Sequence, residues 1–189
     1  MPYRIPKFIT GNYYHVYNRG VAKMPIFLLP QDYRVFMGLM FYHVRTRREK
    51  RVELLSYCLM PNHFHLLLQQ SNDYGISKYI QAFLIGYSMY FNYLHERVGP
   101  LYQGRTKSRL MQNDVDLVNT SRYIHRNPNK ILESNQTLLA YPYSSFSHYV
   151  QDKTASYSKI LSFFNNDPKI YESFVLFESK SASPDLLPY

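Results

Sequence analysis

The sequence contains one cysteine, no tryptophan and no long run of apolar residues. A single cysteine, Cys58, cannot form an internal disulfide, which fits a reducing compartment. No apolar stretch approaches the ~18 residues that a membrane-spanning helix needs. The N-terminal residues MPYRIPKFITG also lack the apolar core of a secretory signal. These absences argue against a disulfide-stapled secreted protein and a membrane protein, and we expect a cytoplasmic protein with no membrane partner.

Acidic residues are also scarce. The 189 residues include 22 Lys and Arg against 13 Asp and Glu, which gives a formal net charge of +9. Such a surplus favours polyanionic partners, nucleic acid first. Twenty tyrosines and twelve phenylalanines accompany this charge. Although most of these rings are expected in the core, aromatic faces beside cations are the usual platform for single-stranded bases, so the composition favours a single-stranded nucleic-acid partner.

Periodicity and turn signals predict an α+β fold. Helices are expected at 31–47, 76–97 and 115–127, and strands at 13–17, 52–60, 63–69 and 105–111. This order is that of a ferredoxin-like (RRM-like) antiparallel sheet with helices on one face, plus a C-terminal helix. We expect the other sheet face to stay free for a ligand. The pattern weakens after residue 134, so we predict a catalytic domain at 1–134 and an appendage at 135–189 that packs on it.

Two histidines alternate on the third expected strand, directly after the turn signal Pro61-Asn62. Because residues two apart on a strand share a face, His63 and His65 point the same way while Phe64 points into the core. Neighbouring imidazoles can share a divalent cation. The pattern alone is weak: it allows an exposed metal-binding pair on the free sheet face, but it favours two partly exposed histidines of no special role.

The last expected helix carries a tyrosine that shares a face with an amide. Tyr123 and Asn127 are four residues apart, so their phenol and amide oxygens project toward the same spot. A free tyrosine has a pKa near about 10 and is a poor nucleophile at neutral pH, which a nearby metal that polarises a phosphate would correct. His125 lies roughly 200° around the helix from Tyr123, and we expect it not to be a ligand.

Six cations are candidates for contact with a DNA backbone: Arg105, Lys107, Arg109, Arg19, Arg122 and Arg126. The first three alternate along the last expected strand, which places them on one face where they can track phosphates. A solvated edge strand that is protected by its charge explains these three equally well. The basic run at 45–51 is interpreted as a solvated helix end rather than a DNA contact.

Five blocks of the sequence together resemble the IS200-like, REP-associated tyrosine transposases of the HUH Y1 transposase family. The blocks follow one another in the family's order over residues 13–149: YHVYNRGVAKMPIF, YCLMPNHFHLLLQ, YQGRTKSRLM, SRYIHRNP and YPYSSFSHY. PNHFHLL and YIHRNP in combination make the resemblance specific, and it implies a ferredoxin-like fold. Tyr143 stands where the family usually has Trp before Ser-Ser, which leaves the role of the appendage in DNA recognition open.

The resemblance also implies a site and a reaction. His63 and His65 match the family's metal-binding His-hydrophobe-His pair, Asn127 the polar residue that completes the metal site, and Tyr123 the nucleophile. With Mg²⁺ or Mn²⁺ as cofactor, Tyr123 would attack phosphorus and leave a 5′-phosphotyrosine link and a free 3′-hydroxyl. The implied substrate is single-stranded or hairpin DNA. A homodimer is possible, because IS200-type relatives work as dimers whereas REP-associated relatives can act as monomers.

Three alternatives differ in what the site is for. A housekeeping relative that processes repeated hairpins would nick DNA without mobilising it, and only the flanking DNA distinguishes this case from transposition. A non-catalytic single-stranded nucleic-acid-binding protein would use charge and aromatics for affinity, but it has no need of the histidine pair, Tyr123 and Asn127 in this arrangement. A zinc hydrolase built on the two histidines would need a third strong ligand, and the sequence offers no convincing third His, Asp or Glu.

Overall fold

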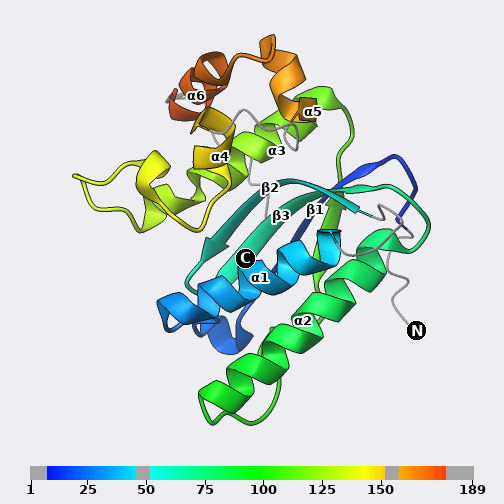
Figure 1. Cartoon of the computed structure of the whole chain (residues 1–189), viewed down its shortest axis with the longest axis vertical. Coiled ribbons are helices and arrows are strands. Elements are labelled where there is room, and N and C mark those ends of the chain that lie inside the picture. Colours follow the sequence, from blue (N-terminus) through cyan, green and yellow to red (C-terminus); the bar gives the residue numbers. More distant parts are fainter. Residues whose placement is uncertain (1–7, 46–51, 152–157, 178–189) are drawn as a thin grey trace.

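The computed structural model describes residues 8–45, 52–151 and 158–177. Four strands form one antiparallel sheet in the order β2-β3-β1-β4. They are β1 (Tyr13–Arg19), β2 (Val52–Met60), β3 (His63–Gln70) and β4 (Lys107–Leu110). The predicted α+β class with an antiparallel sheet is confirmed (Figure 1).

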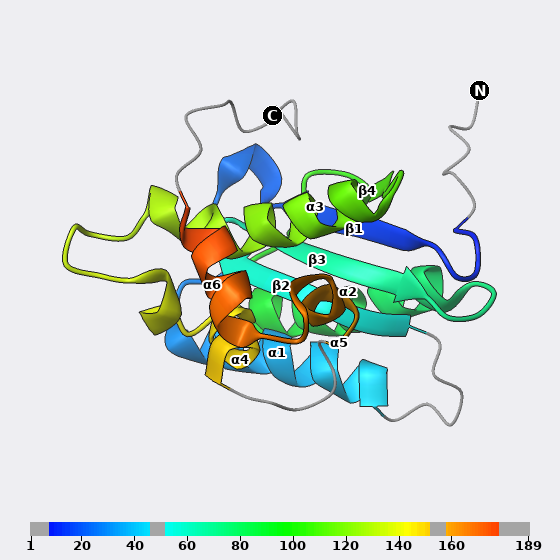
Figure 2. The same ribbon diagram turned by 90° about the horizontal axis from the view of Figure 1, so that it is seen from above.

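Two long helices, α1 (Pro30–Arg45) and α2 (Gly75–Leu94), pack on one face of the sheet (Figures 1 and 2). The strand residues that face them alternate in the sequence, as Val16 on β1 and Phe64 and Leu66 on β3 show. Helix residues at helical spacing complete this core, among them Phe36 on α1 and Phe83 on α2. The 3.6-residue and two-residue periods of the sequence therefore meet in one apolar layer.

The other face of the sheet is covered as well, which corrects the expectation that it stays free. A second layer lies over it in Figure 1, formed by α3 (Asp114–Arg126), α4 (Phe146–Gln151), α5 (Ser158–Leu161) and α6 (Pro168–Leu176). Short 3₁₀ turns occur at Val21–Lys23, Asn127–Lys130, Leu138–Ala140 and Ser162–Phe164. The second sheet face is covered because it is itself apolar. Strand β2 is buried along nearly its whole length, and its residues Cys58 and Met60 are apolar on this second face. An apolar sheet face must itself be covered.

Some element boundaries differ from the sequence prediction. The chain turns at Gly104, where φ is +71°, and β4 begins only at Lys107, so Arg105 lies before the strand. Helix α2 ends at Leu94 rather than at 97, because the chain leaves helical geometry at Glu96, where φ is +50°. The predicted helix end at 46–47 and residues 46–51 of the basic run lie outside the described residues.

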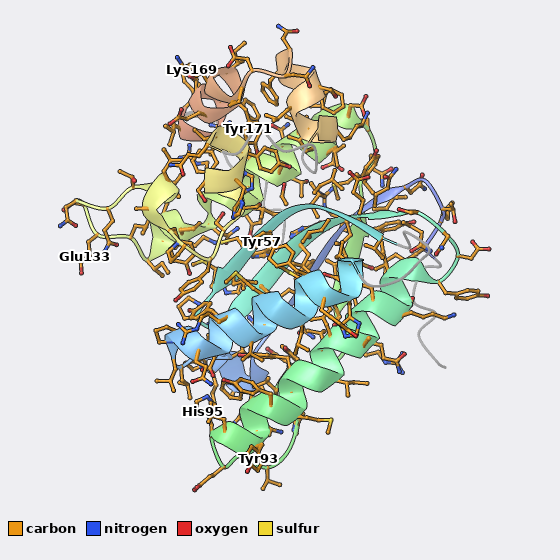
Figure 3. All side chains as sticks on the ribbon, in the orientation of Figure 1. Tyr57, Tyr93, His95, Glu133, Lys169 and Tyr171 are labelled. Carbon is orange, nitrogen blue, oxygen red and sulfur yellow. The ribbon has the colours of Figure 1, made fainter. Side chains whose placement is uncertain are left out.

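A buried network of side-chain hydrogen bonds joins α3 to the appendage. Both ring nitrogens of His125 are engaged, Nε2 with Ser145 Oγ at 2.7 Å and Nδ1 with the hydroxyl of Tyr171 at 2.8 Å. The same hydroxyl lies 2.7 Å from Ser121 Oγ on α3, which contacts Ser56 Oγ on β2 at 2.8 Å. Tyr171 lies among the helices of the second layer (Figure 3). His125 thus has a structural role, and the described part of the appendage shares one core with α3.

Candidate active site

The pairing of β1 with β3 creates a polar patch on the sheet face below α3. Tyr17 lies opposite His65 and Arg19 opposite His63 in the register. A pocket of about 70 Å³ opens here, lined by Tyr17, Asn18, Arg19, His63, Phe64, His65, Gln103 and Lys107. This volume holds only one or two water molecules or an ion, so the pocket suits a small charged group rather than a bulky ligand.

His63 begins β3 directly after the turn and is half-buried. Its Nδ1 lies 2.6 Å from Oδ1 of Asn62, whose amide nitrogen donates to the carbonyl of Lys23. Burial first, then the positive charges of Lys130 and Arg19, lower the pKa of His63 to about 4, although a hydrogen bond with Asn127 opposes the shift. The ring is therefore neutral at physiological pH and is held in one orientation by the turn.

His65 is fully buried, which corrects the expectation of an exposed pair. Its Nδ1 lies 2.9 Å from Nε2 of His15, whereas its Nε2 is buried without a hydrogen-bond partner among the described residues. Burial, then the neighbouring His15 and His63, lower its pKa well below the usual value. Helix α3 packs on β2 and β3 here and brings the ring of Tyr123 against that of His65.

His15 was not predicted as part of the site. It is fully buried on β1, and burial, followed by the charge of Arg109, lowers its pKa to about 3. The signal was present, because His15, Tyr17 and Arg19 alternate along YYHVYNR and so share a face. What the sequence does not give is the register that places this face beside His65.

Tyr123 lies over the histidines of its own chain. Its ring centroid is 5.5 Å from that of His65 at an interplanar angle of 79°, and 6.0 Å from that of His15. The amide nitrogen of Asn127 donates to the carbonyl of Tyr123 at 3.0 Å, which leaves the amide oxygen to face His63. Lys130, which sequence reasoning also missed, places Nζ 5.8 Å from the centre of the Tyr123 ring.

These side chains fit a divalent cation. Neutral imidazole is a common metal ligand, and both rings use Nδ1 for hydrogen bonds while Nε2 of His65 is buried and unmatched. Within the described ranges, no group of three His, Cys, Asp or Glu side chains could hold a metal ion. A third protein ligand would then be the amide oxygen of Asn127, and the zinc-hydrolase alternative gains no third strong ligand from the described residues.

Three of the six candidate DNA-binding cations are engaged inside the protein. Arg109 forms a bidentate ion pair with Asp116 on α3, with both distances at 2.8 Å, and donates to Thr120. Arg126 donates to the carbonyls of Val175 and Phe177 at the end of α6. The third, Arg122, also donates to the carbonyl of Phe177 and lies over the ring of Phe174.

Two of the other three cations line the pocket. Arg105 and Lys107 are exposed, and Lys107 lines the pocket together with Arg19, whose Nε donates to Gln103 at 2.5 Å. The predicted single face of Arg105, Lys107 and Arg109 is therefore not formed, because Arg105 precedes β4 and Arg109 turns to α3.

No helix of the described chain is long and apolar enough to cross a membrane.

Comparisons with known proteins agree with this architecture. Residues 36–127, which hold the histidine pair, Tyr123 and Asn127, match the family model "Transposase IS200 like". Among solved structures, a REP-associated tyrosine transposase bound to a REP hairpin matches with a TM-score of 0.58 and 18% identity, over 80% of this chain and 86% of that one. No curated protein matches the chain. Residues 36–127 are therefore similar to the IS200-like transposase domain, which is found in a family of DNA-cleaving enzymes, and the chain shares the fold of the REP-associated enzyme.

Proposed function

We propose that this protein is a metal-dependent single-stranded DNA endonuclease and strand transferase that cuts hairpin-associated DNA through Tyr123. One observation carries the proposal: the Tyr123 ring lies 5.5 Å from the buried, neutral ring of His65, centroid to centroid, in the same chain. A phenol and an amide beside two imidazoles are the parts that phosphoryl transfer to tyrosine requires.

His63, His65 and Asn127 would hold the cation, Mg²⁺ or Mn²⁺. When bound, it supplies Lewis-acid stabilisation of the negative charge that develops on the phosphate. Two imidazole nitrogens and an amide oxygen are softer than the all-oxygen set that Mg²⁺ prefers, so we expect Mn²⁺ to bind more tightly.

Tyr123 is the nucleophile. Its phenol oxygen attacks phosphorus and loses its proton, the bond to the 3′-oxygen breaks, and the departing 3′-oxygen takes up a proton to become a hydroxyl. The 5′-phosphate stays on the tyrosine. Because a phosphodiester is exchanged for a phosphodiester, the strand can be rejoined without ATP. Lys130, next to the Tyr123 ring, and Lys107, at the pocket wall, are placed to contact phosphate oxygens.

One chain supplies every group of the proposed site. The histidines on β3, Tyr123 on α3 and Asn127 at its end converge within a single chain, and the buried network of His125 and Tyr171 ties α3 to the core. We therefore propose that a monomer cleaves with its own tyrosine, and that the homodimer is not needed for cutting.

The proposed substrate is a DNA hairpin with single-stranded flanks. The REP-associated transposase that shares this fold is described as bound to a REP hairpin. Here, the exposed cations Arg105 and Lys107 at the sheet edge provide charge for a phosphate backbone that approaches the pocket.

Incubation with a single-stranded hairpin oligonucleotide and Mn²⁺, followed by a denaturing gel, tests the proposal. We expect a protein–DNA adduct that disappears with a chelator and in His63→Ala and His65→Ala, while these variants still bind the hairpin. His63→Ala is the cleaner variant, because His65→Ala also leaves a buried cavity and unpairs His15. Normal cutting by both variants would show that the metal site is misassigned. Hairpin binding with no adduct in either metal would instead favour a non-catalytic binding protein.

A further inference from the structure

A fully buried histidine on β1 has a single hydrogen-bond partner among the described residues. His15 is 0% exposed, and its Nε2 lies 2.9 Å from Nδ1 of His65. Its own Nδ1 is buried and has no partner in the described part of the chain. A buried polar ring that makes only half of its hydrogen bonds costs stability. Packing by itself therefore does not explain a histidine at this position, since an apolar side chain would fill it at lower cost.

The hydrogen bond between the two rings restricts where their protons reside. A neutral imidazole donates from one nitrogen and accepts at the other. If Nδ1 of His65 donates to Nε2 of His15, the lone pair on Nε2 of His65 faces the pocket. If His15 donates instead, Nε2 of His65 carries the proton and cannot bind a cation. Only the first arrangement makes His65 a metal ligand.

We infer that His15 is a positioning residue for His65: it accepts the Nδ1 proton and so directs the Nε2 lone pair of His65 toward the cation. The inference rests on the proposed metal site and deepens it. Metal-binding histidines as a rule donate their second N–H to a carboxylate, a carbonyl or water, which fixes tautomer and ring orientation. In this protein an imidazole from the neighbouring strand takes the place of that oxygen acceptor.

The geometry separates His15 from the ligands themselves. Its Nε2 bonds to the nitrogen of His65 that points away from the proposed cation, and the described residues contain no trio of His, Cys, Asp or Glu that could hold a metal. His63 is supported in the same way, because Oδ1 of Asn62 lies 2.6 Å from its Nδ1. Each proposed ligand is thus oriented through its Nδ1 atom, His63 by Asn62 in the β2–β3 turn and His65 by His15 on β1.

Metal binding in the absence of DNA tests the inference. Mn²⁺ affinity would be measured by titration calorimetry on the full chain and on His15→Leu, His15→Gln and His65→Ala. Leucine removes the acceptor while filling similar volume, whereas glutamine keeps an acceptor oxygen near the position of Nε2. We expect His15→Leu to weaken Mn²⁺ binding by about 10- to 100-fold, and His15→Gln to stay close to wild type. Thermal melting of each variant controls for folding.

The tautomer of His65 gives a second readout that depends on neither metal nor activity. Long-range ¹H–¹⁵N spectra should show His65 protonated at Nδ1 in the wild type and in His15→Gln, and should show loss of this state in His15→Leu. An unchanged tautomer and unchanged Mn²⁺ affinity in His15→Leu would overturn the inference. Weakened binding in both His15 variants with an unchanged tautomer would make His15 a ligand, and would overturn it too.

The same measurements separate this inference from the proposed function. If His65→Ala loses Mn²⁺ binding while His15→Leu does not, the metal site stands and the positioning role fails. Equal Mn²⁺ binding by the wild type and by His65→Ala would contradict the metal site itself, whatever the His15 variants show.

Discussion

At the scale of single residues, the unusual feature is a set of histidines kept neutral by burial. Burial is the first cause that lowers the pKa of His15 and of His125 to about 3, that of His63 to about 4, and that of His65 well below its usual value. Three of these four side chains are fully buried. A ring that does not take up a proton keeps a lone pair. The proposed metal site needs this lone pair to bind a cation, and the buried network around His125 needs it to accept a hydrogen bond.

These shifts predict that the protein loses stability as the pH falls below about 6.5. The unfolded chain binds protons at these four histidines near this value while the folded chain does not, so the free energy of unfolding decreases toward low pH. Each group contributes about 1.4 kcal/mol per pH unit until its folded pKa is reached. Four groups together would exhaust a typical stability of about 5–15 kcal/mol within roughly one to three pH units.

The measurement is urea unfolding at a series of pH values between 7 and 5. The slope of unfolding free energy against pH counts the protons taken up on unfolding, and His125→Gln should lower this count by about one. His148→Gln, which replaces an exposed histidine of α4, is the matched control. A stability that does not vary over this range would contradict the neutral buried histidines.

The site residues predicted from the sequence are close to one another along the chain, whereas those that were missed are brought to the site by tertiary structure. His63 with His65, and Tyr123 with Asn127, are local pairs whose spacing on a strand or helix is visible in the chain. His15 joins the site only through the register of β1 with β3, and Lys130 only through the path of the chain after α3. Those two contacts depend on tertiary structure, which local periodicity does not encode.

At the scale of elements, the position of α3 decides whether Tyr123 meets the histidines. The buried network of Ser121, His125 and Tyr171 holds the helix from above, and Arg109 on β4 holds its first turns through Asp116. Although burial raises the pKa of Asp116, hydrogen bonds from Arg109 and the backbone of Gln112 keep it below its usual value. The carboxylate is therefore ionised as the ion pair requires.

Arg109 and Lys107 should respond differently to the same substitution. Arg109→Met removes a bidentate, partly buried pair, so we expect a loss of about 1–3 kcal/mol of unfolding free energy and little change in the salt dependence of DNA binding. Lys107→Met removes an exposed cation at the pocket, so stability should hold while the slope of log affinity against log salt falls by about 1. Urea unfolding and hairpin titrations at several salt concentrations measure both. A reduced salt slope in Arg109→Met with unchanged stability would restore it as a DNA contact.

The sequence predicted most of the strands and helices, but it did not predict that a second layer covers the other face of the sheet. Each strand and helix of the sheet and its first layer follows its periodicity, with shifts of a few residues at Leu94 and Lys107. The covered second face was missed because β2 is nearly all apolar, and a continuous apolar strand indicates burial without naming the element that buries it. The short helices after residue 135 are too brief for a helical period to show.

At the scale of the whole molecule, the protein combines a net charge of +9 with a small pocket at the proposed site. The charge provides attraction over distance, whereas the pocket of about 70 Å³ has room only for a small charged group. We therefore predict that a hairpin with single-stranded flanks binds more tightly than a blunt duplex of equal length, with an affinity that falls steeply with salt because bound phosphates release counterions. Fluorescence anisotropy at several salt concentrations measures this. Tighter binding of the blunt duplex would rule out the proposed substrate.

The identity of the nucleophile tests the proposed function most directly. Replacement of Tyr123 by Phe removes only a hydroxyl, so the fold and hairpin binding should persist while adduct formation falls by about 10³-fold or more. Tyr93→Phe is the control, because Tyr93 is 89% exposed at the far end of α2 (Figure 3). Tryptic mapping of the wild-type adduct should place the nucleotide on Tyr123, in the peptide that ends at Arg126. An adduct on another tyrosine, or one that persists in Tyr123→Phe, would contradict the site described here.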